Sequence, residues 1–194
     1  MTWLPDNYEV PQGSSQFMKL VKGSNQFRVM TLPSLGYEVW EETTEGKKPH
    51  RFHTFQEAVN SPYAGDKIKH FWAFAVWNYS AKQVQILQIT QKSIMKAIEA
   101  LHSDEDWGDP LTYDLVVTRT GDGMDTEYTV QPKPKKPVTE EMTEALKASK
   151  VDLESLFTGN YPMGEQKNEN KATSKPTAIN ETVSDDVADD VPFN

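Results

Sequence analysis

The sequence predicts a mainly β domain, a small barrel of five strands with one helix, followed by an acidic tail. Short apolar runs separated by turn-forming clusters fill most of residues 16–136, a pattern typical of barrels and sandwiches. Within that region one segment has the period of an amphipathic helix. Among the aromatic residues, only Phe157, Tyr161 and Phe193 lie beyond residue 136, so the core is expected to form before that point.

The first strand is predicted from several pieces that follow an N-terminal arm, residues 1–15, in which aromatics mix with Pro and Gly. Phe17–Val21 and Phe27–Leu32 are apolar runs around a turn-type cluster, which predicts a hairpin. Tyr37–Trp40 is a further piece, and we interpret all of them as one long, bent strand. Residues 41–66 are polar and contain Pro and Gly, so we expect a long loop, which is usually functional or disordered.

The most apolar part of the chain predicts a strand, a tight turn and a second strand over His70–Tyr79 and Val84–Thr90. In Gln91–Leu101 the apolar residues recur at helical spacing, and the hydroxyl of Thr90 is the expected N-terminal cap. Side chains alternate along a strand, so its two faces can be separated. We assign Trp72, Phe74 and Val76 to the barrel interior, and leave the opposite face, with Phe71, Ala73, Ala75, Trp77 and Tyr79, for a ligand.

A last hairpin is predicted over Thr112–Thr118 and Thr126–Val130, around a Gly-Asp-Gly turn. The element order is then three strands, one helix and two strands. That order matches a five-stranded OB barrel with its helix between the third and fourth strands, in which residues 41–69 become a binding loop. Another small β barrel, or an α+β sandwich with a helix at one end, is the alternative.

The barrel is expected to end at the Pro-rich segment Pro132–Pro137, which is stiff. Thr139–Ala148 predicts a short helix and Val151–Phe157 a second one. The tail holds few apolar residues and is expected to stay disordered. The predicted divisions are an arm (1–15), an OB domain (16–136), a short helical extension (137–161) and a disordered acidic tail (162–194).

Charge divides in the same way as the aromatics. Residues 137–194 hold 12 Asp and Glu against 5 Lys, whereas residues 1–136 hold 17 against 15 Lys and Arg. The acidic pI of about 4.9 is therefore largely a property of the tail. The body of the chain is close to neutral, so its overall charge does not argue against nucleic acid as a partner.

Composition excludes several classes of site. The chain has no Cys, which excludes disulfides, thiolate nucleophiles and Cys-ligated metals and fits a reducing compartment. It has no N-terminal apolar run of signal-peptide length, and no stretch approaches the roughly 18–20 apolar residues of a membrane span. We expect a soluble, cytoplasmic protein with no membrane partner and no cofactor.

The patterns that would indicate an enzyme are weak. His50 and His53 have the spacing of a metal chelate, but in a polar segment such a pair is usually incidental. The acids between Asp104 and Asp109 follow a helix and precede Pro, which is typical of a solvated turn. No phosphate-binding Gly-rich loop and no nucleophile elbow occurs. A non-enzymatic protein is expected, with a metal-dependent nuclease as the less favoured alternative.

The patterns that indicate nucleic-acid binding are stronger. Residues 67–82 interleave lysines with aromatic residues, and a protein that holds single strands needs flat rings for the bases and cations for the phosphates. The chain has only three arginines, each a candidate for phosphate contact or stacking. The candidate nucleic-acid-binding residues are Arg28, Trp40, Arg51, Phe52, Lys67, Lys69, Trp72, Trp77, Tyr79, Lys82 and Arg119.

The residues resemble a known family, the phage-encoded single-stranded DNA-binding proteins with an OB fold. The resemblance covers about residues 16–136 and is carried by ordered motifs. These are Phe27-Arg-Val-Met, Leu35-Gly-Tyr-Glu-Val-Trp40, Lys69–Tyr79, Ile86–Ile94, Asp106–Leu115, Thr118–Gly123 and Thr126-Glu-Tyr128. It implies a protein that coats and protects single-stranded DNA during phage replication, recombination or repair, in the host cytoplasm. Some members carry a Cys/His zinc site, which this chain cannot form.

A second resemblance concerns the C-terminus. Asp185–Asn194 looks like the acidic tip of bacterial single-strand binding proteins, which ends in acids followed by Ile/Val-Pro-Phe. It implies that partner proteins of replication and repair dock on Asp189, Asp190, Val191, Pro192 and Phe193. Such a tip can also compete weakly for a basic groove. This chain departs from the pattern because Asn194 follows Phe193.

Two questions stay open at this point. A different class of function, an OB-like interaction module that binds protein or oligosaccharide, is the main alternative. Assembly into a homo-oligomer is a further possibility. No residue can be identified that reads a 2′-hydroxyl, so the choice of DNA over RNA rests on the resemblance.

Overall fold

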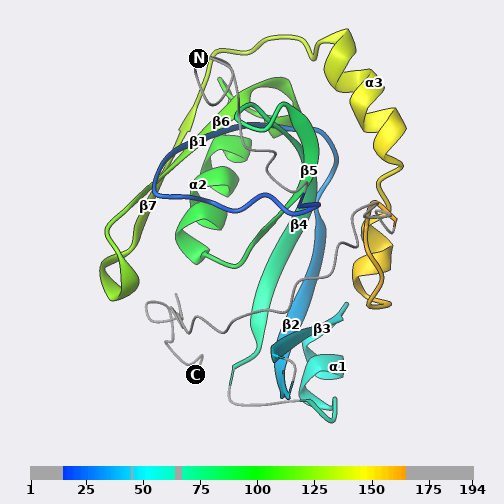
Figure 1. Cartoon of the computed structure of the whole chain (residues 1–194). Coiled ribbons are helices and arrows are strands. Elements are labelled where there is room, and N and C mark those ends of the chain that lie inside the picture. The colour runs from blue at the N-terminus through cyan, green and yellow to red at the C-terminus, as the bar shows by residue number, and fades with distance from the viewer. Residues whose placement is uncertain (1–14, 45, 64–66, 165–194) are drawn as a thin grey trace, which may run out of the picture.

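A computed structural model describes residues 15–44, 46–63 and 67–164 of the 194-residue chain. It is mainly β, with seven strands in one antiparallel sheet, three α-helices and three short 3₁₀ helices (Figure 1). The strands are β1 (Gly23–Val29), β2 (Ser34–Thr43), β3 (Gly46–Phe52), β4 (Lys69–Asn78), β5 (Gln83–Ile89), β6 (Asp114–Thr120) and β7 (Glu127–Pro132). The helices are α1 (Phe55–Val59), α2 (Lys92–Ser103), η1 (Pro110–Thr112), η2 (Gly123–Asp125), α3 (Glu140–Ser149) and η3 (Leu153–Leu156).

Strand β4 is the centre of the sheet. On one edge it pairs with β5, and on the other with β1 near Asn78 and with β2 near Lys69. β1 and β2 therefore run in succession along the same neighbour, as the two halves of one bent strand would. β1 also pairs with β6, which pairs with β7. Within the described residues no pairing joins β5 to β7, so the sheet is open and a closed barrel is not formed.

The inner face of the sheet holds the larger core. Phe74 and Val76 of β4 point into it, as the strand alternation predicts, and pack with Phe27, Leu87 and Leu115. Helix α2 lies across this face and contributes the fully buried side chain of Ile94. The helical period of the segment is confirmed. Its N-terminal cap, however, is Gln91, which makes no side-chain capping bond, and not Thr90.

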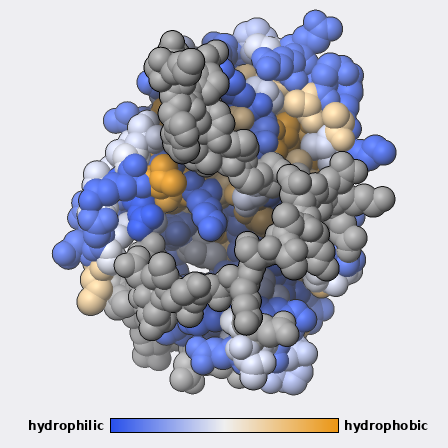
Figure 2. Space-filling model, viewed as in Figure 1, coloured by the Kyte–Doolittle hydropathy of each residue, from blue (hydrophilic) through white to orange (hydrophobic). Residues whose placement is uncertain are grey.

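The outer face of β4 and β5 holds a second core. Phe71, Ala73, Ala75 and Trp77 alternate with the inner residues and are all buried. The C-terminal segment packs on them through Met142 of α3 and Leu156 of η3, which are 5% and 2% exposed. In Figure 1 this segment lies along one side of the sheet, next to β5. In Figure 2, viewed from the same side, most of the visible described residues are hydrophilic, and hydrophobic ones are visible beside α3 as well as on the opposite side of the molecule.

The hairpin predicted from Phe17–Val21 and Phe27–Leu32 is wrong. Phe17 forms only an isolated parallel bridge to Ile86, and Met18 donates a hydrogen bond to the carbonyl oxygen of Ile86 (2.9 Å). β1 cannot pair with residues 17–21 in a hairpin because it is already hydrogen-bonded to β4 on one edge and to β6 on the other. The side-chain amide of Asn25 instead bonds the backbone of Val21, which turns the chain away.

The long loop predicted over residues 41–66 is also wrong. β2 continues to Thr43, β3 returns beside it from Gly46 to Phe52, and α1 follows. β3 is polar because it is an edge strand with one solvated side, and an edge tolerates Pro49, whose nitrogen cannot donate. α1 begins at a capping box, in which Thr54 accepts from Glu57 N and Glu57 accepts from Thr54 N. The described part of the chain thus forms seven strands where five were expected.

The other elements agree with the sequence. β4 and β5 form the predicted strand, turn and strand, and β6 and β7 form the predicted hairpin. α3 begins at Thr139, whose hydroxyl accepts from Met142 N (3.3 Å). The second expected helix is shorter, the 3₁₀ turn η3. Among the described residues, no helix has the length and apolar character to cross a membrane.

Candidate nucleic-acid interface

Several residues predicted from the sequence do lie along one face, the outer face of β4. Arg28 stands opposite Trp77 in the register of β1 and β4, so its side chain is on the same side of the sheet. At the other end of β4, the guanidinium carbon of Arg51 lies 5.9 Å from the centre of the Phe71 ring. Rings therefore occupy this face between two arginines.

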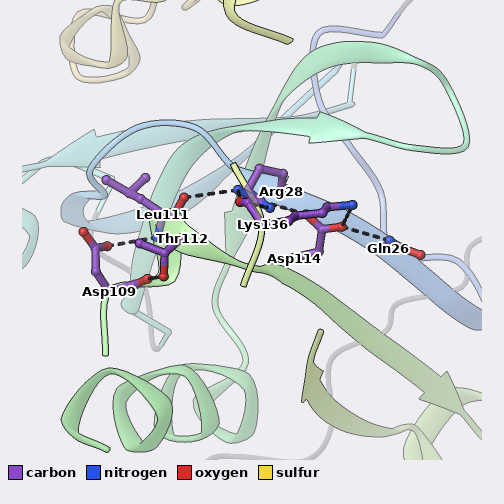
Figure 3. A network of polar contacts seen from close by, with 7 residues as sticks. All are labelled: Gln26, Arg28, Asp109, Leu111, Thr112, Asp114 and Lys136. Carbon is purple, nitrogen blue, oxygen red and sulfur yellow. Dashed lines mark hydrogen bonds and ion pairs between the residues drawn. The ribbon is translucent and has the colours of Figure 1, made fainter. Parts of the chain in front are cut away.

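Arg28 is fully buried in an ion pair. Its Nε donates to Asp114 Oδ1 (2.7 Å), and Nη1 and Nη2 both donate to the carbonyl oxygen of Lys136 (3.0 Å each; Figure 3). Both side chains of the pair are 0% exposed. The guanidinium is therefore used inside the fold, which removes Arg28 from the set of cations available to a phosphate in this conformation.

Lys136 and Tyr79 complete this network. Lys136 Nζ lies 2.7 Å from Asp114 Oδ2 and 4.9 Å from the centre of the Tyr79 ring. Burial raises the pKa of the Tyr79 phenol, and the positive charge of the neighbouring Lys136 opposes that shift. Burial alone would raise the pKa of Asp114, but the contacts with Lys136, Arg28 and Gln26 outweigh it and hold that pKa below its usual value.

Arg51 is also held within the protein. Its side chain is 12% exposed, Nε donates to Gln88 Oε1 (3.1 Å), and Glu38 Oε2 lies 3.8 Å away. Gln88 in turn donates to Glu38 (2.6 Å), so the three side chains form a closed set. Burial lowers the pKa of the Arg51 guanidinium, and the charge of Glu38 opposes that shift.

The open stacking face expected on this side of β4 is not what the structure has. Trp77 is 5% exposed and Phe71 0%. They are buried by the C-terminal cover, by which we mean residues 140–163, comprising α3, η3 and the chain that follows. The alternation of β4 was predicted correctly, but the face assigned to a ligand is occupied by the protein itself.

The cover is fastened at its far end by aromatic and polar contacts. The Phe157 ring stacks on His53, with centroids 3.7 Å apart, and Glu154 lies 3.6 Å from His53 Nε2. Beneath the Phe157 ring lies Gly36, whose lack of a side chain leaves room for that ring, because a Cβ there would lie 2.7 Å from Phe157 Cε1. Gln16 bonds the backbone of Met163 through its Oε1.

The remaining candidates are spread over other surfaces. Trp40 is 44% exposed and donates from Nε1 to Glu38 Oε1 (3.2 Å). Lys82 is exposed, in a turn where its φ is 51°, and Arg119 donates to the carbonyl oxygen of Leu20. Lys67 is exposed, while Lys69 and Phe52 are half-buried. The structure thus does not bring all eleven candidates to one trench.

A different set of rings does form a continuous surface row, drawn from α1, β2 and β4. The Tyr37 ring lies 5.6 Å from Phe55 in an edge arrangement and 4.9 Å from His70. Trp72 Nε1 lies 3.2 Å from His70 Nε2. His70 is exposed, Phe55 is 53% exposed, and Tyr37 and Trp72 are half-buried. We call Phe55, Tyr37, His70 and Trp72 the aromatic row.

The row begins at Trp72, which packs against the inner core, and continues along β4 and β2 toward α1 (Figure 1). Leu35, which is 50% exposed, stands opposite Trp72. On β3 the same face continues with Phe52, opposite Tyr37, and with His50, which stacks on Tyr63 at 3.6 Å. Lys48 follows at the next position on that face, and is exposed.

Sequence reasoning singled out Trp72 but missed Tyr37, Phe55 and His70. Tyr37 and His70 are neighbours only because β2 and β4 pair in this register. The usable signal was the alternation of Leu35, Tyr37 and Val39 in β2, which predicts that their side chains share one face of the strand. It does not predict which strand lies beside them. Phe55 was lost because the segment was expected to be a loop.

Metal ligation was tested in the same way. Among the described residues no group of three or more His, Asp or Glu comes together as a metal site would require. His50 and His53 point to different partners, Glu41 and Glu154. The acidic tip with Asp189, Asp190, Val191, Pro192 and Phe193 lies outside the described residues, as does most of the N-terminal arm. Comparison of the chain with protein-family models and with curated proteins gives no match.

Proposed function

We propose that the protein binds single-stranded DNA, without catalysing a reaction, and that the aromatic row is its stacking surface. The observation that carries the proposal is the continuous, solvent-accessible run of four rings from three elements. Unpaired bases expose flat π-faces, which double-stranded DNA hides, so such a row selects single strands with little regard to sequence. Lys48 on the same face supplies a cation for the backbone.

The strand order supports this proposal. Taken as one bent strand, β1 and β2 are followed by β3 and α1 and then by β4, β5, helix α2, β6 and β7. With β3 and α1 counted as an insertion, this is the order expected of an OB barrel. OB barrels are partly open, and they bind oligonucleotides on the second and third strands and on the neighbouring loops. β4 and the β2–β3–α1 region correspond to one of those strands and to the first of those loops.

The resemblance of residues 16–136 to phage single-stranded DNA-binding proteins extends the proposal. In that reading the protein coats and protects single strands during replication, recombination or repair in the host cytoplasm. Its acidic tip recruits partner proteins through Asp189–Phe193. These roles are proposed from the motifs and from the tail sequence.

The test is titration of a fluorescent oligo(dT) with the full-length protein and with Tyr37→Ala and Phe55→Ala. Each variant should weaken binding by about 5- to 150-fold, because stacking contributes about 1–3 kcal/mol per base. The matched control is Tyr161→Ala, which removes a ring that is 61% exposed but outside the row. If about four phosphates are contacted, the plot of log affinity against log salt should have a slope of about −3.

No binding of oligo(dT) at low salt would defeat the proposal, and equal losses in Tyr37→Ala and Tyr161→Ala would remove the row from it. The same titration with oligo(rU) and with a duplex separates DNA from RNA and single strands from double strands. An interaction module is the competing function, because Leu35, Phe55 and Val59 expose apolar surface near the row that would also suit a protein partner.

A further inference from the structure

The outer face of β4 and β5 is an apolar strip that a separate segment covers. Along β4 the small side chains of Ala73 and Ala75 lie between Phe71 at one end and Trp77 at the other, and Ile86 of β5 stands opposite Ala75. Met142 and Leu156 of the cover pack on this strip. An amphipathic segment laid in an apolar groove is the usual arrangement of a peptide on its receptor. Here the occupant belongs to the same chain.

This strip also has the chemistry of a single-strand site. Rings at both ends can stack with bases, and the small side chains between them let a strand approach the backbone of the sheet. The Arg51 guanidinium lies beside Phe71, and Lys136 Nζ lies over the ring of Tyr79, the next outward residue after Trp77. Arg51 and Lys136 thus lie at the two ends of the line of outward-facing rings of β4. In this structure Arg51 is paired with Glu38 and Lys136 with Asp114.

The cover has properties of a competitor for such a strand. It carries five acidic residues, Glu140, Glu141, Glu144, Asp152 and Glu154, against two lysines. It docks mainly by apolar side chains, and the ion pair at its far end, between His53 and Glu154, joins side chains that are 54% and 71% exposed. Its near end follows Lys136, whose carbonyl oxygen is held by Arg28, so the cover can lift about a fixed point.

We propose that the cover is displaced when single-stranded DNA binds, and that the DNA then occupies the outer face of β4. This inference rests on the proposed function. The structure described here is the closed state. Phe71 and Trp77 are then a second stacking surface, used only in the open state. A helix of ten residues is marginal in water, so α3 loses its helical hydrogen bonds once it lifts.

The first experiment detects the opening without DNA. The chain has no Cys, so one can be placed beneath the cover, Ala73→Cys, and one in the inner core of the same strand, Val76→Cys. Both positions are 0% exposed. If the cover lifts, the thiol at position 73 should react with a labelling reagent faster than that at 76 by roughly tenfold or more, because local opening costs less than global unfolding. Equal rates would overturn the proposal. Ala75→Cys serves if Ala73→Cys does not fold.

The second experiment adds oligo(dT) and follows backbone hydrogen exchange of the full-length protein. Amides of residues 140–149 should lose protection at saturating oligo(dT), while those of β6 do not. If oligo(dT) binds and these amides keep their protection, displacement is refuted but DNA binding stands. If oligo(dT) does not bind, the proposed function fails, and the labelling rates still show whether the cover opens.

A third variant shifts the balance between the two states. Leu156→Ala removes a buried anchor of the cover, whereas Leu32→Ala removes an equal side chain that is 74% exposed. Leu156→Ala should raise oligo(dT) affinity by roughly fivefold or more, because apparent affinity scales with the fraction of open molecules. Leu32→Ala should leave it unchanged. Weaker binding by Leu156→Ala would show that the cover supports the site, contrary to the proposal.

Discussion

Asp114 shows how one carboxylate fixes the end of the sheet domain. It is fully buried, at the start of β6, and bonds Arg28 from β1 and Lys136 from the linker before α3. A buried ion pair contributes little net stability, but removal of one partner leaves the other charge uncompensated. Asp114 therefore acts on the fold and on the position of the cover together, since Lys136 is the point from which the cover departs.

Replacement of Asp114 by Asn should lower the free energy of unfolding by about 3–5 kcal/mol, as measured by urea denaturation. Asp122→Asn is the control, because Asp122 makes an exposed ion pair with Lys22, and exposed pairs contribute little. If both variants unfold at the same urea concentration as the unchanged protein, Asp114 does not have this role.

The same carboxyl predicts a pH dependence. The pKa of Asp114 is lower in the folded protein than the value of about 3.9 that an unfolded chain has. The folded state thus gains stability that is present above about pH 4 and is lost as pH falls through the folded-state pKa. Urea midpoints measured from pH 7 down to pH 2 should fall less steeply in Asp114→Asn than in the unchanged protein. A parallel decline in both would contradict the assignment.

At the scale of elements, β2 and η3 are matched at a single glycine. Gly36 of β2 lies against Phe157, the C-cap residue of η3, and a Cβ there would come within 2.7 Å of Phe157 Cε1 and 2.8 Å of the Phe52 carbonyl oxygen. No real Cβ is accommodated at such distances without movement of a neighbour. The absence of a side chain at Gly36 is what lets Phe157 pack beside Phe71, at a centroid separation of 5.9 Å.

Gly36→Ala should accordingly destabilise the protein by about 1–3 kcal/mol, as overpacking does. Because Phe157 is the movable neighbour, most of the effect should appear as loss of hydrogen-exchange protection in residues 153–158. Gly46→Ala is the comparison, since its Cβ would meet nothing within 4 Å, although its φ of 127° adds backbone strain. Loss of protection spread evenly over the sheet in Gly36→Ala would contradict a local clash with η3.

At the scale of the whole molecule, one sheet presents two aromatic surfaces on opposite faces. The aromatic row is accessible, and the outer face of β4 is covered. The excess of acidic over basic residues is concentrated after the sheet domain, first in the cover and then in the tail. A net negative segment reduces the affinity of a neighbouring surface for phosphates, and salt screens the effect.

Deletion of residues 181–194, which removes Asp185, Asp186, Asp189 and Asp190, should therefore tighten oligo(dT) binding, most clearly at low salt. The measurement is the same fluorescence titration at several salt concentrations. The deletion also removes Glu181. A variant in which the four Asp residues are Asn and Glu181 is Gln therefore keeps the length of the chain and isolates the charge. Unchanged affinity at every salt concentration would rule out competition by the tail.

The sequence predicted what local patterns determine. The alternation of Phe74 and Val76 with Ala75 and Trp77 correctly separated the two faces of β4, and the 3.6-residue period correctly predicted α2. The sequence could not show that the outer face of β4 is covered. The apolar side chains of α3 indicate that the helix packs against something, but they do not specify which face of the sheet it packs on. β3 was missed for a physical reason as well, since a solvated edge strand lacks the apolar run by which strands are recognised.

The candidate site was predicted in part for the same reason. Trp77 and Arg28 were both named as candidates and lie on one face of the sheet, but their burial depends on Met142 and Asp114, which are far away in the sequence. The aromatic row depends on the pairing of β2 with β4 after the break between β1 and β2. Such long-range register is set by the whole sheet and cannot be read from a window of neighbouring residues.

The contact between Gln16 and the backbone of Met163 and Gly164 joins the two ends of the described chain. Polypeptides whose ends meet tolerate circular permutation. A permuted chain that links Gly164 to Ser15 through a short Gly-Ser bridge, and is cut open between β2 and β3, would keep the covalent order of every other strand. The C-terminal cover would then be covalently attached at both of its ends. If DNA binding at the outer face of β4 requires displacement of the cover, the permuted protein would remain in the closed state.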